Sequence, residues 1–273
     1  MRVTTAASRT GEVTLRLEST PETGLVAWVT IDNEAKLNAL NSTVLRRFAE
    51  TIEGLGAHAD LRAVVVTGAG ERAFVGGADI REMAELADHV EARRFIEAVH
   101  RACKAVREAP VPVIGRINGH ALGAGLELAA SCDLRIAAST ATFGMPEVLL
   151  GLPSVVEAAL LPTLIGWGRA RRLLLLGETI GAEEALAWGL VERVAEPGAA
   201  LDAAVAEWLK MLGRAGPQAL RLQKRLIRAW EDLPMAEAIR AGIDSFAEAW
   251  RGEEPRRMLR AFLDRPRHPP KKG

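Results

Sequence analysis

Two glutamates occur in segments of the sequence that are otherwise apolar. Glu127 lies in "GHALGAGLELAASCDLRI" (Gly119–Ile136), and Glu147 lies in "FGMPEVLLGLP" (Phe143–Pro153). Burying an unpaired carboxylate is costly or raises its pKa. Two such acids indicate a pair that takes up and releases protons during a reaction. The alternative interpretation is that each carboxylate accepts a hydrogen bond from a backbone N–H or pairs with an arginine from elsewhere.

Two glycine-containing stretches have the same expected architecture. "AFVGGADIREM" (Ala73–Met83) and "GHALGAGLEL" (Gly119–Leu128) each follow an apolar strand, pass through glycines and open a helix. The first N–H groups of a helix have no partner inside it and carry the positive end of its dipole. Two such turns at the carboxyl edge of one parallel sheet would hold a negatively charged oxygen. Tight turns without a ligand remain the alternative. A nucleotide phosphate site is disfavoured, because neither GxGxxG nor GxxxxGK[ST] occurs in these stretches.

The surrounding segments predict an α/β fold. "VTLRLE" (Val13–Glu18) and "LVAWVTI" (Leu25–Ile31) flank the turn "ETG" and predict a hairpin, and Asn41 is a candidate helix N-cap. Apolar, β-branched runs predict further strands at 61–68, 111–117 and 134–138, with one long helical region over 80–108. After residue 155 helices are expected at 155–165, 167–176, 182–189, 199–213, 216–230, 235–251 and 255–264.

The composition excludes several classes of function. The chain has 273 residues, with 35 basic and 35 acidic side chains. A neutral balance disfavours general nucleic-acid and membrane-surface binding, and no apolar run reaches the roughly 20 residues of a membrane helix. The two cysteines, Cys103 and Cys132, are expected to be buried free thiols in a reducing cytoplasm.

Five segments, in order, resemble the enoyl-CoA hydratase/isomerase (crotonase) superfamily. They are "KLNALN" (Lys36–Asn41), "GAGERAFVGGADIREM" (Gly68–Met83), "INGHALGAGLELAASCDLRIA" (Ile117–Ala137), "TFGMPEVLLGLP" (Thr142–Pro153) and "LLLLGETIGAEEALAWGLVERV" (Leu173–Val194). The resemblance extends from about residue 13 to the end of the chain. It implies repeated ββα units wound in a spiral over residues 1–197, with an all-helical region at 198–273 for packing and oligomerisation.

The resemblance also implies roles for individual residues. The backbone N–H groups of Ala78 and Ala124 form an oxyanion hole, and Glu127 and Glu147 are the two catalytic carboxylates. Residues expected to bind substrate are Ala35, Leu37, Gly76, Asp79, Ile80, Arg81, Ser154 and Phe262. No metal or other cofactor is expected, because coenzyme A is part of the substrate.

The resemblance implies hydration of a 2-enoyl-CoA thioester. Other reactions of the superfamily are the alternatives, namely double-bond isomerisation, thioester hydrolysis or decarboxylation. A different class of function, RNA binding by the basic segment 256–272 or a non-catalytic assembly role, is also considered. The absence of tyrosine and the presence of six phenylalanines leave little for base stacking. The expected assembly is a homotrimer or homohexamer. The basic segment 256–272 is expected to be a solvated last helix and tail; the alternative is that Phe262 of one subunit closes a neighbour's coenzyme groove.

The segment after Pro153 departs from the family pattern. "SVVEAALLPTLIG" (Ser154–Gly166) replaces a glycine-rich stretch, so Ser154 and two valines are expected to reshape the acyl pocket. Glu157 is a third acid in an apolar setting, with a salt bridge to Arg169 or Arg171 as its simplest interpretation. His120 is expected to be a packed or edge residue, and the tryptophans at 167, 188, 208 and 230 are expected to lie in the core or an interface.

Overall fold

The strands form two sheets that lie side by side in the chain's α/β body. The computed structural model describes residues 11–264, so the last part of the predicted basic tail lies outside the described residues. The large sheet has the order β1-β2-β3-β5-β7-β10, and the small sheet has the order β4-β6-β8-β9. The strands of the large sheet are β1 (Glu12–Thr20), β2 (Gly24–Asp32), β3 (Leu61–Gly68), β5 (Val113–Ile117), β7 (Leu134–Ala138) and β10 (Arg193–Ala195). Those of the small sheet are β4 (Ala73–Val75), β6 (His120–Leu122), β8 (Thr142–Gly144) and β9 (Thr179–Gly181).

The predicted hairpin is confirmed, and the rest of the large sheet is parallel. β1 pairs with β2 in antiparallel register, with Thr20 opposite Gly24 at the turn. β2, β3, β5, β7 and β10 then follow one another in parallel pairs. Seven of the eight residues of β3 are buried, as expected for a β-branched strand covered on both faces.

Three strands of the large sheet are each followed by a short strand of the small sheet. β3 leads to β4, β5 leads to β6 and β7 leads to β8. Helices follow the first two of these pairs, so the chain winds in successive ββα turns, as the family resemblance implied. The short strands have three residues each and were not predicted from the sequence, because three residues carry no readable periodicity.

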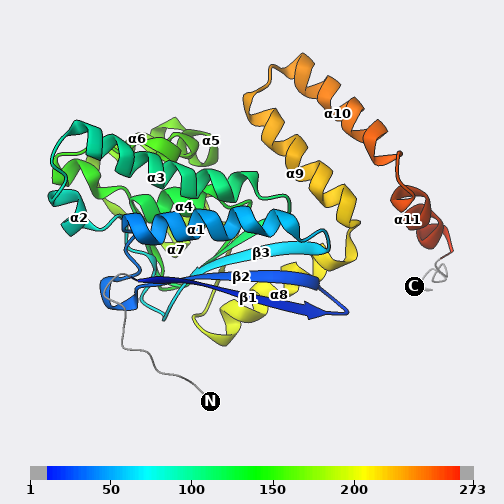
Figure 1. The fold of residues 1–273 in the computed structure, drawn as a ribbon, viewed down its shortest axis with the longest axis horizontal. Helices are drawn as coiled ribbons and strands as arrows, with labels where there is room; N and C mark the ends of the chain where they lie inside the picture. Colours follow the sequence, from blue (N-terminus) through cyan, green and yellow to red (C-terminus); the bar gives the residue numbers. More distant parts are fainter. Residues whose placement is uncertain (1–10, 265–273) are drawn as a thin grey trace, which may run out of the picture.

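Helices cover both faces of the large sheet. In Figure 1, α1 and α3 lie above the sheet and α8 lies beneath it, against β3, β5, β7 and β10. The helices are α1 (Ser42–Gly54), α2 (Ile80–Ala84), α3 (His89–Glu108), α4 (Ala124–Ser131), α5 (Leu161–Ile165), α6 (Trp167–Leu176), α7 (Ala182–Trp188), α8 (Ala199–Arg214), α9 (Pro217–Asp232), α10 (Met235–Ala249) and α11 (Glu254–Leu263). Short 3-10 helices are η1 (Glu34–Lys36), η2 (Leu55–Ala57), η3 (Pro146–Leu150) and η4 (Val156–Leu160).

Two of the predicted helical regions are divided in the structure. The region over 80–108 is α2 and α3, and α3 begins at a new N-cap, where the side chain of Asp88 accepts hydrogen bonds from the N–H groups of Val90 and Glu91. The region over 155–165 is η4 followed by α5, because Pro162 lacks an N–H and occupies the first turn of a new helix.

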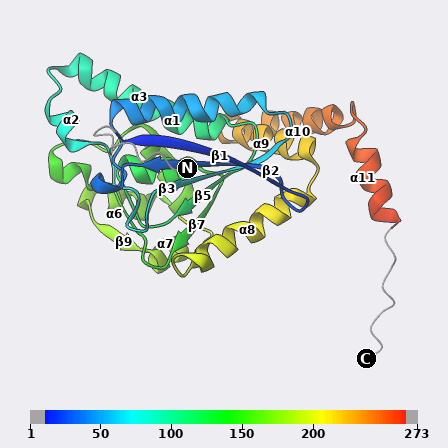
Figure 2. The same cartoon turned by 60° about the horizontal axis from the view of Figure 1, so that its bottom comes forward.

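The last three helices, α9 to α11, extend outward from the α/β body, and α9 is bonded to it. α9 is fixed to the body by Lys224, whose Nζ lies 2.7 Å from Oδ2 of Asp133 and 3.1 and 3.0 Å from the carbonyl oxygens of Val106 and Val111. α10 returns along α9, and α11 stands at the far end from α2 (Figures 1 and 2). No helix within residues 11–264 is both long and apolar enough to cross a membrane.

Candidate active site

The two glycine turns meet at the carboxyl ends of neighbouring parallel strands. β4 pairs with β6 in parallel, so the turn after Val75 and the turn after Leu122 emerge side by side. Gly77 has a φ of 115°, and a Cβ atom there would lie 3.3 Å from the carbonyl oxygen of Leu122. The expected meeting of the two turns at one sheet edge is therefore confirmed. The edge belongs to the small sheet, whose strands the sequence did not reveal.

In the first turn, the backbone N–H of Ala78 is not used in the pairing with the neighbouring segment at Leu40. The Leu40 N–H donates to the carbonyl oxygen of Gly77, and the Asp79 N–H donates to that of Leu40, both at 2.8 Å. Since the groups on either side of Ala78 are used in this way, the Ala78 N–H faces away from Leu40. This geometry allows the Ala78 amide to serve as a donor at the site.

The second turn begins helix α4. Gly123 is its N-cap, with a φ of 51°, a conformation that favours glycine. The Gly123 carbonyl accepts hydrogen bonds from the N–H groups of Leu126 and Glu127. Ala124 is the first residue of the helix, where an N–H group has no partner within the helix. Two main-chain donors from separate turns are thus available to a negatively charged oxygen.

Glu127 and Glu147 both lie at the Gly123 turn. Glu127 is in the first turn of α4 and 4% exposed, and its Oε1 accepts a hydrogen bond of 3.2 Å from the Ala158 N–H. Glu147 is half-buried at the start of η3, directly after Pro146. A Cβ atom on Gly123 would lie 2.3 Å from Oε1 of Glu147, so this carboxylate packs directly against the glycine. The structure therefore brings the two predicted acids together.

The environment of Glu127 favours its protonated form. Burial, the nearby charge of Glu147 and the charge of Glu157 raise the pKa of Glu127 to about 8, and the Ala158 hydrogen bond opposes the shift. A buried carboxyl group that titrates near neutral pH can accept and donate protons under physiological conditions.

Ser154 contacts one of the two acids directly. Its Oγ donates a hydrogen bond of 2.7 Å to Oε2 of Glu147. Val155 is exposed and Val156 is half-buried. The predicted change in the segment after Pro153 therefore places a hydroxyl donor against Glu147.

The residues predicted to line the coenzyme groove come from two segments, 35–37 and 76–81, which contact each other. The Gly76 N–H donates to the Leu37 carbonyl at 2.8 Å, and Lys36 Nζ lies 2.7 Å from Oδ2 of Asp79. The buried Asp79 carboxylate also caps α2, so its oxygens are held by the protein. Side chains that face outward here are those of Ala35, Ile80 and Arg81.

Comparison with known proteins places the fold and the sequence in one family. The family model described as enoyl-CoA hydratase/isomerase matches residues 22–271. The chain belongs to the enoyl-CoA hydratase/isomerase family. It is 37% identical to the short-chain-enoyl-CoA hydratase of Clostridium acetobutylicum over 89% of this chain and 92% of that protein. It is 34% identical to the crotonyl-CoA hydratase of Syntrophomonas wolfei over 86% of this chain and 90% of that protein.

Solved structures of the enoyl-CoA hydratase/isomerase family include close matches to the fold. An enoyl-CoA hydratase from Bacillus anthracis superposes with a TM-score of 0.85 at 31% identity, covering 94% of this chain and 96% of that chain. Both the sequence segments and the arrangement of the two sheets are therefore typical of the family.

The predicted partners of Glu157 are wrong. Its carboxylate lies 2.9 Å from Nδ1 of His100 and 3.7 Å from Nη1 of Arg107, both on α3. Arg169 instead donates to the Trp188 carbonyl, and Arg171 stacks on Trp167. The contacts of Glu157 with His100 and Arg107 were missed because no spacing in the sequence links these segments.

Other predictions for single residues have mixed outcomes. Cys103 and Cys132 are buried free thiols, and burial raises the pKa of Cys132 to about 12. His120 is half-buried, with Nδ1 2.7 Å from Oγ1 of Thr142, as expected for a packed residue. Trp188 is buried, whereas Trp167 is 65% exposed and lies outside the core.

The remaining predicted contact, Phe262, lies far from these turns. It is on α11, 66% exposed, at the opposite end of the chain from α2 (Figure 1). Within one chain it does not reach the site. Among residues 11–264, no group of three or more His, Cys, Asp or Glu side chains is arranged to hold a metal ion.

Proposed function

We propose that this chain is an enoyl-CoA hydratase, which adds water reversibly across the 2,3 double bond of a 2-enoyl-CoA thioester to give a 3-hydroxyacyl-CoA. The single observation that carries the proposal is the position of Glu127 and Glu147 at one turn, beside the amide of Ala124. The names of the relatives, short-chain-enoyl-CoA and crotonyl-CoA hydratase, support the same reaction.

In this proposal the thioester oxygen binds between the amides of Ala78 and Ala124. Addition of water at Cβ moves negative charge onto that oxygen, and two main-chain donors stabilise the resulting enolate. One donor of this kind is worth roughly 10²–10³ in rate. Because the donors are main-chain groups, an alanine at either position serves as well as a glycine.

Glu127 is proposed as the base, and Glu147 as the acid. The deprotonated Glu127 orients a water molecule and takes its proton while the oxygen attacks Cβ. Glu147 then delivers a proton to Cα, and in dehydration the two roles exchange. The Ala158 N–H holds one oxygen of Glu127, and Ser154 holds one oxygen of Glu147, which keeps both carboxyl groups in place.

A coenzyme A thioester is the proposed substrate, and no further cofactor is needed for this reaction. Its coenzyme portion is proposed to run along Ala35, Leu37, Gly76, Ile80 and Arg81, with Asp79 fixing the wall through Lys36. The enzyme is proposed to act in the cytoplasm.

A homotrimer or homohexamer is the proposed assembly. α10 carries exposed apolar side chains at Met235, Ile239, Ile243 and Phe246, spaced to lie along one face of the helix. An apolar face of this kind indicates a protein interface. A second copy would cover this face, and its α11 would bring Phe262 to a neighbouring coenzyme groove.

The test is a turnover screen with purified protein. Hydration of crotonyl-CoA is followed by the loss of the enoyl absorbance, and the product is identified as 3-hydroxybutyryl-CoA by chromatography. Longer, branched and aromatic enoyl-CoA thioesters define the acyl pocket. Isomerisation of a 3-enoyl-CoA without hydration of any 2-enoyl-CoA would contradict the proposal and favour the isomerases of the family.

A further inference from the structure

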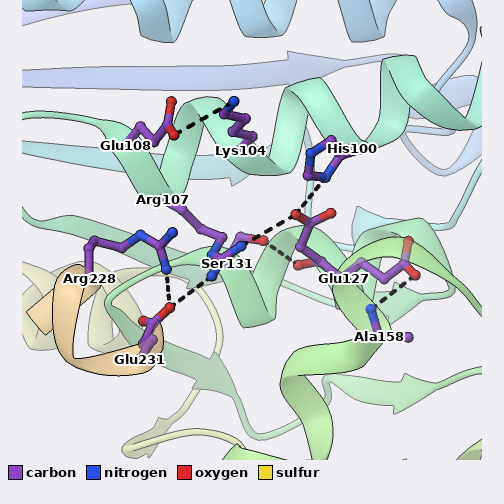
Figure 3. A network of polar contacts seen from close by, with 10 residues as sticks. His100, Lys104, Arg107, Glu108, Glu127, Ser131, Ala158, Arg228 and Glu231 are labelled. Atoms are coloured by element: carbon purple, nitrogen blue, oxygen red, sulfur yellow. Dashed lines mark hydrogen bonds and ion pairs between the residues drawn. The ribbon is translucent and has the colours of Figure 1, made fainter. Parts of the chain in front are cut away.

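A third buried carboxylate lies behind the catalytic pair. Glu157 is on η4 and 3% exposed. Its Oε1 lies 2.9 Å from Nδ1 of His100 and 3.7 Å from Nη1 of Arg107, so two side chains of α3 hold the same oxygen. Figure 3 shows His100 and Arg107 on α3, with Glu127 and Ala158 nearby.

The other oxygen of Glu157 is unusual. Oε2 is buried and has no hydrogen-bond partner among residues 11–264. A buried polar group left without a partner destabilises the folded state. The presence of a carboxylate here is explained if its charge acts on a neighbouring group.

Glu157 is linked to Glu127 through one peptide unit. The next residue, Ala158, donates its N–H to Oε1 of Glu127 at 3.2 Å. The preceding residue, Val156, has a φ of 38°, a conformation that β-branched residues rarely adopt. The backbone that presents the Ala158 amide is therefore strained, and the anchoring of Glu157 to α3 opposes its relaxation.

We propose that Glu157 is a positioning residue for Glu127: anchored by His100 and Arg107, it fixes the Ala158 amide on one oxygen of Glu127 and places a third negative charge behind that carboxyl group. This inference rests on the proposed function for its kinetic meaning. The structural relationship itself does not depend on the reaction.

The charged and titratable groups around Glu127 and Glu157 come from three elements. α3 contributes His100, Arg107 and Cys103, η3 contributes Glu147, and α9 contributes Glu231, which lies 2.8 Å from Nη2 of Arg107. Burial raises the pKa of Cys103, so this thiol adds no charge. Glu147 and Glu157 both favour the protonated form of Glu127, and Arg107 partly neutralises Glu157.

The test compares two variants of the intact protein that should shift the pKa of Glu127 in opposite directions. Glu157→Gln keeps the shape and an acceptor for His100 but removes the negative charge. Arg107→Gln removes the facing positive charge. The titration of Glu127 is followed by the infrared band of its protonated carboxyl group, identified as the band that Glu127→Gln abolishes. This measurement needs no turnover.

We expect Glu157→Gln to lower the midpoint of this titration by about half a pH unit or more, and Arg107→Gln to raise it. Glu108→Gln is the matched control: Glu108 follows Arg107 on the same helix but pairs with Lys104, at 3.8 Å, so the midpoint stays at the wild-type value. Glu157→Ala removes the anchor as well and should lower kcat for crotonyl-CoA about tenfold, with KM nearly unchanged.

An unchanged midpoint in Glu157→Gln would overturn the inference, as would shifts of the same sign in Glu157→Gln and Arg107→Gln. If Glu157→Gln does not fold, Arg107→Gln decides, and a midpoint that does not rise overturns the proposal. Opposite shifts in a protein that hydrates no enoyl-CoA would support the positioning of Glu127 and refute the proposed function instead.

Discussion

Oγ of Ser154 lies 2.7 Å from Oε2 of Glu147. The hydrogen bond joins the loop before η4 to the first residues of η3, and it fixes one oxygen of an acid whose other oxygen lies against Gly123. Glu147 is thus held from both sides. Ser154, which we expected to reshape the acyl pocket, contacts this carboxyl group directly.

Replacing this serine tests the value of that hydrogen bond. Ser154→Ala should lower kcat for enoyl-CoA hydration about tenfold, because a hydrogen bond to a charged group is worth about 1.5–3 kcal/mol and Glu147 gains freedom without it. KM should change little. Ser139→Ala removes a similar bond, to the exposed Glu196, and should leave steady-state kinetics unchanged. If Ser154→Ala is as active as the wild type, Ser154 does not contribute to the orientation of Glu147 during catalysis.

Gly123 should tolerate no side chain. Gly123→Ala places a Cβ 2.3 Å from Oε1 of Glu147 at a φ of 51°. We expect a loss of at least about a hundredfold in kcat, since both Glu147 and the adjacent Ala124 amide shift. Gly168→Ala, in α6 with open space around the new methyl group, is the control and should be slightly stabilising. The two variants are compared by kcat and by thermal unfolding.

Glu127 should make the fold less stable as pH rises. Its pKa is raised from 4.5 to about 8 in the folded chain, so the folded state binds the extra proton. The free energy of unfolding therefore falls as pH rises from about 4.5 to about 8 and is constant above that range. At about 1.4 kcal/mol per unit of pKa shift, the loss is of order a few kcal/mol.

Glu127→Gln tests this dependence by chemical denaturation at several pH values. The glutamine cannot ionise but still offers an oxygen to the Ala158 N–H. The variant should be more stable than the wild type at pH 8.5 and close to it at pH 4.5. A gain of this kind is expected when a catalytic residue lowers the stability of the fold. A difference that does not depend on pH would show that Glu127 ionises normally.

The rate should follow the same titration. As a base, Glu127 works only when deprotonated, so kcat/KM for hydration should rise with pH through about 8, the pKa of the free protein. The measurement is a pH profile of kcat/KM with crotonyl-CoA under conditions where the protein stays folded. A kcat/KM that falls above pH 8 would instead assign the proton donor to Glu127 and the base to Glu147.

Much of the fold could be predicted from the sequence. The buried strand β3, the hairpin of β1 and β2 and the N-cap at Asn41, which accepts from the Val44 N–H at 2.9 Å, each follow from local patterns. The pairing of Glu127 with Glu147 was also accessible, because apolar sequence around an acid is unusual enough to require an explanation.

The remaining features depend on contacts between distant segments. β4 and β6 are too short for a periodic pattern, although they bring the two turns together. The neighbours of Glu157 come from α3, fifty or more residues earlier, and the sequence contains nearer arginines that suggested a different pair. Tertiary packing determines which basic residues contact Glu157, and the local sequence does not indicate which ones these are.

The central claim is that Glu127 and Glu147 work together on one substrate. It is tested most directly by kcat for crotonyl-CoA hydration in Glu127→Gln, Glu147→Gln and the double variant. We expect each single substitution to lower kcat by at least about a hundredfold, and the double variant to lose far less than the product of the two losses, because residues that act as a unit are not additive. Retention of wild-type kcat by either single variant would contradict the account.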